Sequence, residues 1–127
     1  MSGIRTVCDL FGLTERAVRF YEERGLVEPA RDRFNCRKYD ARARARLQLI
    51  AEYRRVGLSI EDIQEILSLE PMGAAAQRTR ATQTLRKRIA ELDAARRQAE
   101  SLIQRFASEE IVAVNSDSRL RVAGGAR

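Results

Sequence analysis

The sequence contains no histidine, so the usual general base and the commonest metal ligand of proteins are both missing. Hydrolytic or zinc chemistry would have to rely on carboxylates and on two separated cysteines, Cys8 and Cys36. Two cysteines also make a disulfide framework improbable. We therefore predict that the protein is not an enzyme and that it has no catalytic residue, no metal site and no cofactor.

Long apolar runs are missing as well. No window approaches the roughly 18 to 20 apolar residues that span a bilayer. The first residues also lack the charged stretch and apolar segment of a secretion signal. These absences favour a soluble, cytoplasmic protein without a membrane partner.

The charge of the chain gives the first positive indication. Its 127 residues include 24 Lys+Arg against 18 Asp+Glu, a net charge of +6. A surplus of this size in a small protein indicates a polyanionic partner, and nucleic acid fits better than a membrane. Only Lys38 and Lys87 are lysines. The rest are arginines, whose planar guanidinium suits both phosphates and guanine edges.

A helix-turn-helix is predicted near the N-terminus. Four apolar residues at helical spacing mark its first helix: Ile4, Val7, Cys8 and Phe11. Gly12 follows at the position of a left-handed C-cap, and Thr14 offers its hydroxyl as the N-cap of a second helix that ends at Gly25. The apolar face of that second helix holds Ala17, Phe20 and Tyr21. Its arginines, which suit a phosphate backbone, are Arg16, Arg19 and Arg24.

A basic hairpin, or wing, is predicted from Val27 to Tyr39. The helical periodicity stops in this segment, and Pro29 prevents a helix from continuing. The cations of the segment are Arg31, Arg33, Arg37 and Lys38. Asn35 suits a turn position with positive φ.

Two further helices complete the predicted head of the protein. Asp40 is placed to cap a third helix that runs to about Arg55. Ser59 with Asp62 resembles a capping box for a short fourth helix. The apolar positions of these two helices are Leu47, Leu49, Ile50 and Tyr53, followed by Ile60, Ile63, Ile66 and Leu67.

A connection and a long helix are predicted after the head. Residues 68–76 contain Pro71, Gly73 and three alanines, which interrupt the large apolar side chains. A 4-3-4-3 spacing, with Arg96 as its one polar member, then predicts an apolar seam. The seam consists of Leu85, Ile89, Leu92, Ala99, Ile103 and Phe106. Because so small a head cannot easily cover this seam, we predict that it pairs with a second copy of the chain.

One stretch of the sequence carries a family likeness. Residues 14–27, Thr-Glu-Arg-Ala-Val-Arg-Phe-Tyr-Glu-Glu-Arg-Gly-Leu-Val, resemble the signature of MerR-type regulators. The similarity continues through Pro29–Arg31, Arg37–Asp40 and residues 56–63, so it covers roughly residues 4–70. The resemblance implies a dimer with an antiparallel dimerisation helix that bends and untwists promoter DNA with an overlong spacer.

The predicted fold is therefore mostly α, with a winged helix-turn-helix head and a long dimerisation helix that forms an antiparallel coiled coil. We assign residues 1–70 to the DNA-binding domain and residues 71–108 to the linker and dimerisation helix. Residues 109–127 have little to bury and are expected to form a short, flexible tail.

The resemblance also implies which residues contact DNA. They are Arg16, Arg19, Tyr21, Arg37, Tyr39 and Ser59. Arg16 would reach the major groove, Arg19 and Tyr21 would hold phosphates, and Arg37 with Tyr39 would anchor the wing. Ser59 would lie at a helix start whose amides favour a phosphate. A solvated helix face remains the alternative for the two helical arginines, and core packing remains the alternative for the tyrosines.

The wing departs from the family pattern. The family commonly has Asn-Gly-Tyr-Arg where this chain has Phe34-Asn35-Cys36-Arg37, so the family's turn geometry and the contact of the missing tyrosine are not carried over to this chain. Cys36 becomes an exposed thiol, whereas Cys8 is expected to be buried. Metal-sensing relatives place cysteines at and after the dimerisation helix. Residues 71–127 contain none, so no metal-sensing site is predicted.

The leading hypothesis is a homodimeric, sequence-specific transcriptional regulator of double-stranded promoter DNA, with RNA polymerase as an open further partner. One alternative is an architectural or excisionase-like protein that bends DNA without acting on transcription. Another is a protein-interaction adaptor with a vestigial head, which the density of Arg and Tyr in the head disfavours.

Overall fold

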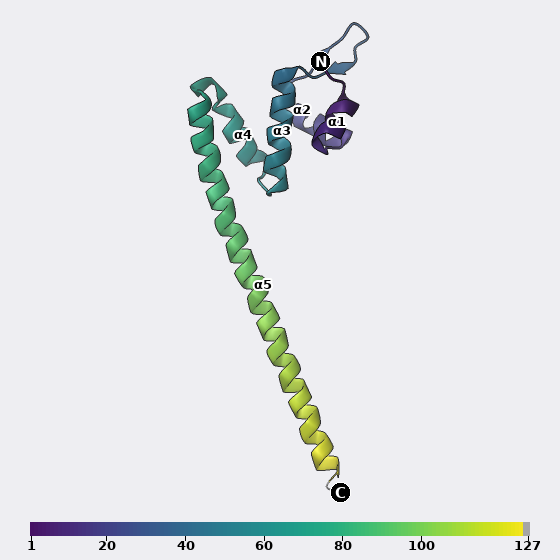
Figure 1. The fold of residues 1–127 in the computed structure, drawn as a ribbon, viewed down its shortest axis with the longest axis vertical. Coiled ribbons are helices and arrows are strands. Elements are labelled where there is room, and N and C mark those ends of the chain that lie inside the picture. The colour runs from purple at the N-terminus through teal and green to yellow at the C-terminus, as the bar shows by residue number, and fades with distance from the viewer. Residues whose placement is uncertain (126–127) are drawn as a thin grey trace. The chain divides into compact units, whose positions relative to one another are not determined.

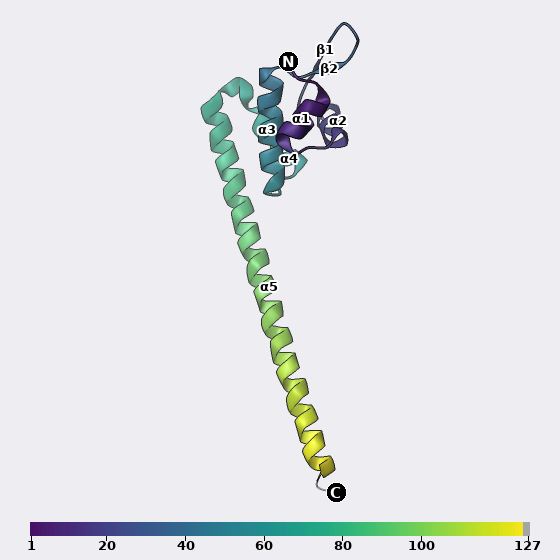
Figure 2. The same ribbon diagram turned by 45° about the vertical axis from the view of Figure 1, so that its right-hand side comes forward.

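A computed structural model describes the backbone of residues 1–125 and the side chains of residues 1–115 (Figures 1 and 2). The elements in chain order are α1 (Ile4–Phe11), α2 (Glu15–Glu23), β1 (Ala30–Arg31), β2 (Arg37–Lys38), α3 (Ala41–Arg55), α4 (Ile60–Ser68), the 3₁₀ helix η1 (Glu70–Met72) and α5 (Ala74–Gly125). The chain divides into two units, Met1–Arg88 and Ile89–Arg127. The first unit contains every element before α5 together with the first turns of α5, so the predicted mostly α fold with a helix-turn-helix and a wing is confirmed.

The helix-turn-helix is built by the local signals that predicted it. Gly12 ends α1 with a left-handed φ of 66° and donates its N–H to the carbonyl of Cys8. The hydroxyl of Thr14 caps α2 by accepting the N–H of Ala17 at 3.0 Å. Helix α1 contacts both α2 and α3, so these three helices share one core.

The predicted wing is a short antiparallel hairpin. Ala30 pairs with Lys38, and Arg31 pairs with Arg37. Asn35 lies in the loop between the strands with a φ of 60°, as the sequence predicts. The left-handed conformation is one that asparagine tolerates better than most residues with a side chain.

The starts of α3 and α4 are also capped as predicted. The carboxylate of Asp40 accepts the N–H of Ala43 at 2.8 Å. Ser59 and Asp62 form a capping box, in which each side chain accepts the backbone N–H of the other residue. A cap of this kind stabilises a helix by about 1 kcal/mol.

The core of the first unit is apolar. Its largest fully buried side chains are Tyr39, Leu47, Ile50, Leu58, Ile63, Ile66, Val7 and Val18. Burial of each aliphatic side chain of this size contributes about 1.5–3 kcal/mol to folding. Cys8 is buried and Cys36 is exposed, as predicted.

The connection before the long helix is shorter than the predicted segment of residues 68–76. The short helix η1 and Gly73, which has a φ of 102°, make the turn, and α5 begins at Ala74. The sequence analysis took the alanines as an interruption because they lack large side chains. Alanine is the best helix former, so these residues start the helix.

Helix α5 is 52 residues long and continues to Gly125, past the expected boundary at residue 108. Residues 109–123 contain neither proline nor glycine, and extension of an existing helix adds one backbone hydrogen bond per residue. The backbone is therefore helical up to Gly125, where a flexible tail was expected from residue 109. Residues 126–127 of the expected tail lie outside the described residues. None of the described helices has an apolar stretch able to cross a membrane.

Candidate nucleic-acid interface

Helix α2 carries exposed arginines on its solvent face. Arg16 and Arg19 are both exposed, three positions apart, which places them on neighbouring parts of one face. Arg19 pairs with Glu15 at 3.4 Å, and because both side chains are exposed this ion pair is weak. The face therefore presents cations that a polyanion can recruit at little cost.

Phe20 lies on this exposed face and not on the apolar face to which the sequence analysis assigned it. Its side chain is 42% exposed, and the guanidinium of Arg24 lies 5.8 Å from its ring centroid. Val18 takes the core position instead and is fully buried beside Tyr21. Phe20 is thus a candidate contact residue that the sequence analysis missed, because an aromatic residue in a helix was read as core.

A hollow of about 310 Å³ lies beside this face. Its lining residues are Thr14, Arg16, Ala17, Phe20, Tyr21, Arg54 and Ile60. Residues from the starts of both α2 and α4 line this hollow, and Ser59 caps the start of α4. The N–H and hydroxyl of Ser59 are both engaged with Asp62, so the predicted phosphate contact of Ser59 competes with its role as a helix cap.

The two tyrosines predicted to contact phosphates lie in the core. Tyr21 is buried, and Tyr39 is fully buried, with its backbone bridged to Ser2 near the N-terminus. The hydroxyl of Tyr39 donates to the carboxylate of Glu22. Burial and this anion raise the pKa of Tyr39 above its ordinary value. Both tyrosines thus lie where core packing, the alternative kept open for them, places them in the free chain, and their phosphate contacts stay a prediction.

Glu22 joins α2 to the wing. Its carboxylate accepts the Nε–H of Arg37 at 2.9 Å as well as the hydroxyl of Tyr39. Glu22 is largely buried and Arg37 is partly buried, so this contact is less screened than a surface ion pair. Arg37, predicted as an anchor of the wing on DNA, is thus held within the protein.

The sequence analysis did not identify Glu22. The only available signal was an acidic side chain in the middle of a segment read as phosphate-binding, and its partners lie 15 and 17 residues away in the sequence.

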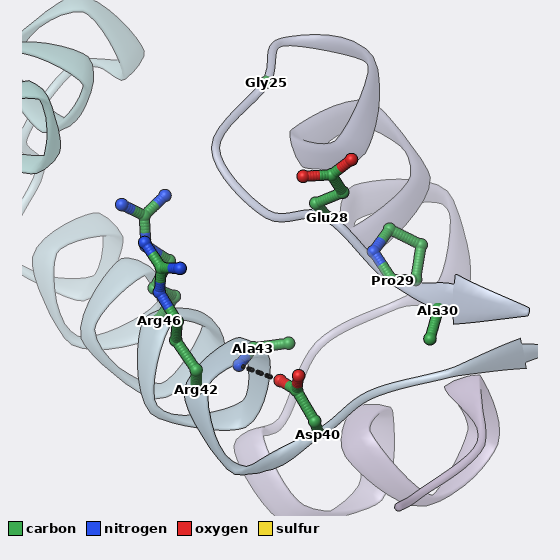
Figure 3. A pocket seen from close by; sticks show the side chains of 8 residues that line it. All are labelled: Gly25, Glu28, Pro29, Ala30, Asp40, Arg42, Ala43 and Arg46. Carbon is green, nitrogen blue, oxygen red and sulfur yellow. Dashed lines mark hydrogen bonds between the residues drawn. The ribbon is translucent and has the colours of Figure 1, made fainter.

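A second hollow, of about 380 Å³, lies between the start of the wing and α3 (Figure 3). It is lined by Gly25, Glu28, Pro29, Ala30, Asp40, Arg42, Ala43 and Arg46. Figure 3 shows Arg42 and Arg46 rising from α3, with Glu28 on the opposite wall. Charges of both signs line this space.

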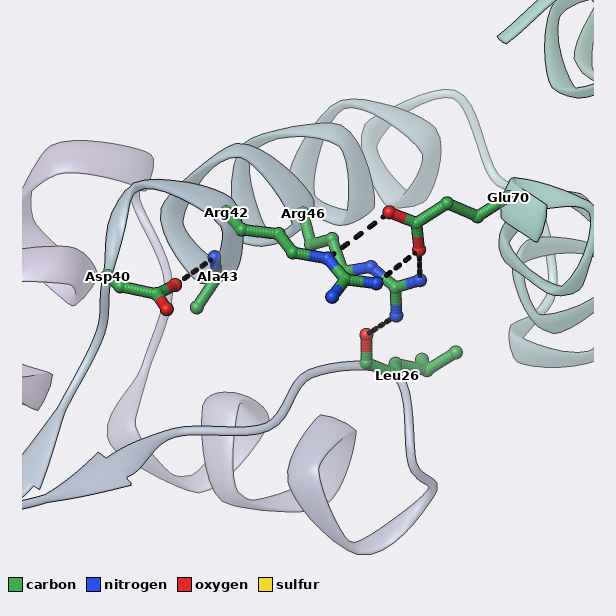
Figure 4. A network of polar contacts seen from close by, with 6 residues as sticks. All are labelled: Leu26, Asp40, Arg42, Ala43, Arg46 and Glu70. Atoms are coloured by element: carbon green, nitrogen blue, oxygen red, sulfur yellow. Dashed lines mark hydrogen bonds and ion pairs between the residues drawn. The ribbon is translucent and has the colours of Figure 1, made fainter. Parts of the chain in front are cut away.

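The same two arginines hold the connection between the head and the long helix (Figure 4). Arg42 donates twice to Glu70 at the start of η1, at 2.9 and 3.2 Å, and Arg46 pairs with the same carboxylate. These two guanidinium groups hold the pKa of Glu70 below its usual range. Arg46 also donates to the carbonyl of Leu26 at 3.0 Å, so it spans from the segment after α2 to η1.

The predicted seam is partly exposed in the single chain. Its exposed members on α5 are Ile89, Leu92, Ala99, Ile103 and Phe106. Leu85 differs, because it packs against the core of the first unit. The second unit therefore offers an uncovered apolar stripe, and Leu85 belongs to the head.

Two family models match the chain. One, described as "MerR HTH family regulatory protein", matches residues 3–70, and the other, described as "MerR, DNA binding", matches residues 44–108. Together they cover α1 to α4, the wing and the part of α5 that holds the seam.

Curated relatives agree with these models. The HTH-type transcriptional regulator CueR of Vibrio cholerae serotype O1 is 35% identical over 107 residues, which cover 79% of this chain and 77% of that protein. CueR of Escherichia coli O6:H1 is 39% identical over 67 residues, 52% of this chain and 50% of that protein. The match to the Escherichia coli relative thus spans about half of its length.

A solved structure shares the fold. HiNmlR, described as a MerR family regulator lacking the sensor domain, bound to promoter DNA, matches with a TM-score of 0.57 and 22% identity. The match covers 72% of this chain and 75% of that chain.

Proposed function

Because the chain belongs to the MerR family of regulatory proteins, we propose that it binds promoter DNA as a homodimer, distorts it and so regulates transcription. The observation that carries this proposal is the exposed cationic face of α2, which a largely buried carboxylate ties to a basic wing. The protein acts on DNA by binding, without a catalytic step, as expected of a regulator.

The major groove is the site proposed for α2. B-DNA admits an α-helix there, and the guanidinium of arginine fits the O6 and N7 atoms of guanine. Arg16, in the first turn of α2, is the proposed base contact. Arg19 leaves its weak pair with Glu15 to hold a phosphate, and the ring of Phe20 offers an apolar contact for a thymine methyl.

The wing is the proposed second contact. Its exposed cations, Arg31 and Arg33, lie along the backbone of the duplex, while Glu22 fixes the base of the wing to α2. Because the two elements are joined in the protein, little ordering entropy is lost when both touch DNA.

The apolar stripe on α5 is the proposed dimer contact, in which a second copy covers Ile89, Leu92, Ile103 and Phe106. A dimer places two α2 helices on two half-sites, which explains how a head of four short helices attains specificity. RNA polymerase is the proposed further partner of the protein on a promoter.

Two alanine variants test the DNA face. The probe is a duplex enriched by in vitro selection with the full chain from a random library, compared with a scrambled duplex of equal composition. Arg16→Ala should weaken binding to the selected duplex by about 1–3 kcal/mol and relax specificity at one position. Arg19→Ala should weaken binding to both duplexes and reduce the dependence of affinity on salt, because fewer counterions are released.

The matched control is Arg78→Ala, which removes the same charge from an exposed position on α5. It should bind like the parent protein at both salt concentrations. Parental affinity in both Arg16→Ala and Arg19→Ala would contradict the proposed DNA face.

A further inference from the structure

The tip of the wing presents an exposed aromatic side chain. Phe34 is 72% exposed and lies in the loop between β1 and β2, which Figure 2 shows extending away from the helices. Single exposed apolar residues are ordinary on protein surfaces. This one is different in its setting, because the loop around it is basic and is held in one conformation.

Hydrogen bonds within the loop fix the position of Phe34. The carboxylate of Asp32 accepts the backbone N–H of Phe34 at 2.8 Å and that of Cys36 at 3.0 Å. Arg31 donates to the carbonyl of Asn35 at 3.1 Å, which closes the turn at the left-handed residue. These contacts hold the loop through its backbone and the side chains of Arg31 and Asp32, and the exposed ring of Phe34 takes no part in them.

The base of the wing is fixed to α2. Glu22 accepts hydrogen bonds from Arg37 and Tyr39, the residues at which the hairpin returns to the core. The position of the ring is therefore set relative to the helix proposed to enter the major groove. A hairpin fixed beside that helix would be placed over DNA next to the major groove that the helix enters.

We propose that Phe34 is a minor-groove wedge, which enters between two base pairs of duplex DNA while α2 occupies the adjacent major groove. This inference rests on the proposed function and adds a specificity-determining residue to it. Apolar side chains inserted between base steps unstack them and bend the duplex. The minor groove is about 6 Å wide, and an aromatic ring on a narrow hairpin tip fits it better than a helix does.

Arg33 supplies the charge beside the wedge. Its guanidinium lies 5.0 Å from the centroid of the Phe34 ring in the free protein, a cation–π contact that is weak at an exposed site. On DNA, Arg33 is free to turn to a phosphate or into the narrow groove, where the negative potential attracts arginine. A wedge flanked by a cation favours flexible pyrimidine–purine steps, because these steps unstack most readily.

The test uses the full chain and the selected duplex, with 2-aminopurine replacing adenine at successive positions in the region that a footprint assigns to the wing. Binding of the parent protein should raise the fluorescence at one step, since 2-aminopurine brightens when it is unstacked. Phe34→Ala should abolish that rise and weaken binding about tenfold, with an unchanged salt dependence because no charge is removed. Phe34→Leu should keep part of both effects.

Met72→Ala is the matched control, because Met72 is another exposed apolar side chain of the first unit. This variant should behave like the parent protein. Thermal unfolding should be unchanged in all three variants, since Phe34 and Met72 lie on the surface.

Each alternative outcome has one meaning. Equal affinity and equal fluorescence for Phe34→Ala and the parent would overturn the wedge and leave the proposed function standing. Weaker binding by Phe34→Ala without any fluorescence rise in the parent would also overturn it, in favour of a contact with the sugar-phosphate backbone. Failure of the parent protein to enrich any duplex would instead reject the proposed function itself.

Discussion

At the residue scale, one carboxylate determines how the wing is attached. Glu22 accepts a neutral donor, the hydroxyl of Tyr39, and a cationic donor, the Nε–H of Arg37. If either donor is lost, a largely buried anion keeps a single partner, and desolvation makes that costly. The wing therefore depends on Tyr39 for its attachment, although Tyr39 is not on the surface proposed to meet DNA.

Tyr39→Phe should lower the free energy of unfolding by about 1.5–3 kcal/mol, the usual range for a hydrogen bond to a charged group. The folded protein raises the pKa of Tyr39, so the hydroxyl stabilises the fold below its ordinary pKa of about 10 and loses that contribution as the pH rises further. The variant should thus lose less stability than the parent between pH 8 and pH 11. Urea unfolding of both proteins across this range measures the effect.

Comparison of the parent protein with Tyr39→Phe isolates the contribution of Tyr39 to the pH dependence of stability from that of Tyr53. Burial also raises the pKa of Tyr53, but that group is common to parent and variant and cancels in their difference. Unchanged stability of Tyr39→Phe together with weaker DNA binding would return Tyr39 to the role of a phosphate contact.

At the scale of elements, the pairing of η1 with α3 fixes the start of the long helix. Arg42 binds both oxygens of Glu70, and Arg46 adds a second cation to the same carboxylate. The Glu70 carboxylate is partly exposed, so water and salt weaken each pair. The contact matters mainly because the two-pronged pairing with Arg42 orients η1 against α3.

Glu70→Gln should lower the stability at neutral pH by less than about 1 kcal/mol, because the pair is screened. The folded protein lowers the pKa of Glu70, so its contribution is present above the ordinary pKa of about 4.3 and is lost as the pH falls below that value. The variant should therefore show a shallower loss of stability between pH 5 and pH 3. Glu109→Gln, which breaks an exposed pair within α5, is the control and should follow the parent.

Thermal unfolding at several pH values provides the measurement for Glu70→Gln. Identical acid profiles of the variant and the parent would show that Glu70 does not hold η1 in solution.

The elements that the sequence predicted are those with local signals. Thr14, Asp40 and Ser59 cap helices through partners three residues away, so the sequence alone fixes these helix starts. Glu22 and Glu70 pair with residues 15 to 28 positions away, and no spacing rule gives such pairs before the fold is known. The exposure of Phe20 was missed for the same reason, and the sequence could only leave core packing of Tyr39 open as an alternative, since both depend on tertiary packing.

At the scale of the whole molecule, the apolar stripe on α5 is exposed in the single chain and is expected to bind a partner helix. It contains large apolar side chains, among them Ile89, Leu92, Ile103 and Phe106, that stay exposed in one chain. A contiguous apolar seam of this kind is covered by another helix in a stable coiled coil. The dimer proposed for this protein supplies that helix.

Leu92→Asp should convert the dimer to a monomer, since a carboxylate in an apolar interface has no partner to offset its desolvation. Light scattering coupled to size-exclusion chromatography measures the mass, and circular dichroism checks that helix remains. Ala94→Asp adds the same charge two positions along the helix, away from the seam, and should remain dimeric. A dimeric Leu92→Asp protein with parental DNA affinity would place the dimer contact elsewhere.

Arg46 links two segments of the head mechanically. Its guanidinium crosslinks the carbonyl of Leu26, three residues after the end of α2, to Glu70, four residues before the start of α5. A displacement of η1 at the start of α5 would therefore reach the segment after α2 through the contacts of Arg46. If the proposed bending of DNA takes place, a duplex that resists bending would pull on η1 through the same contacts, so the stiffness of the DNA would become a load on the start of the long helix.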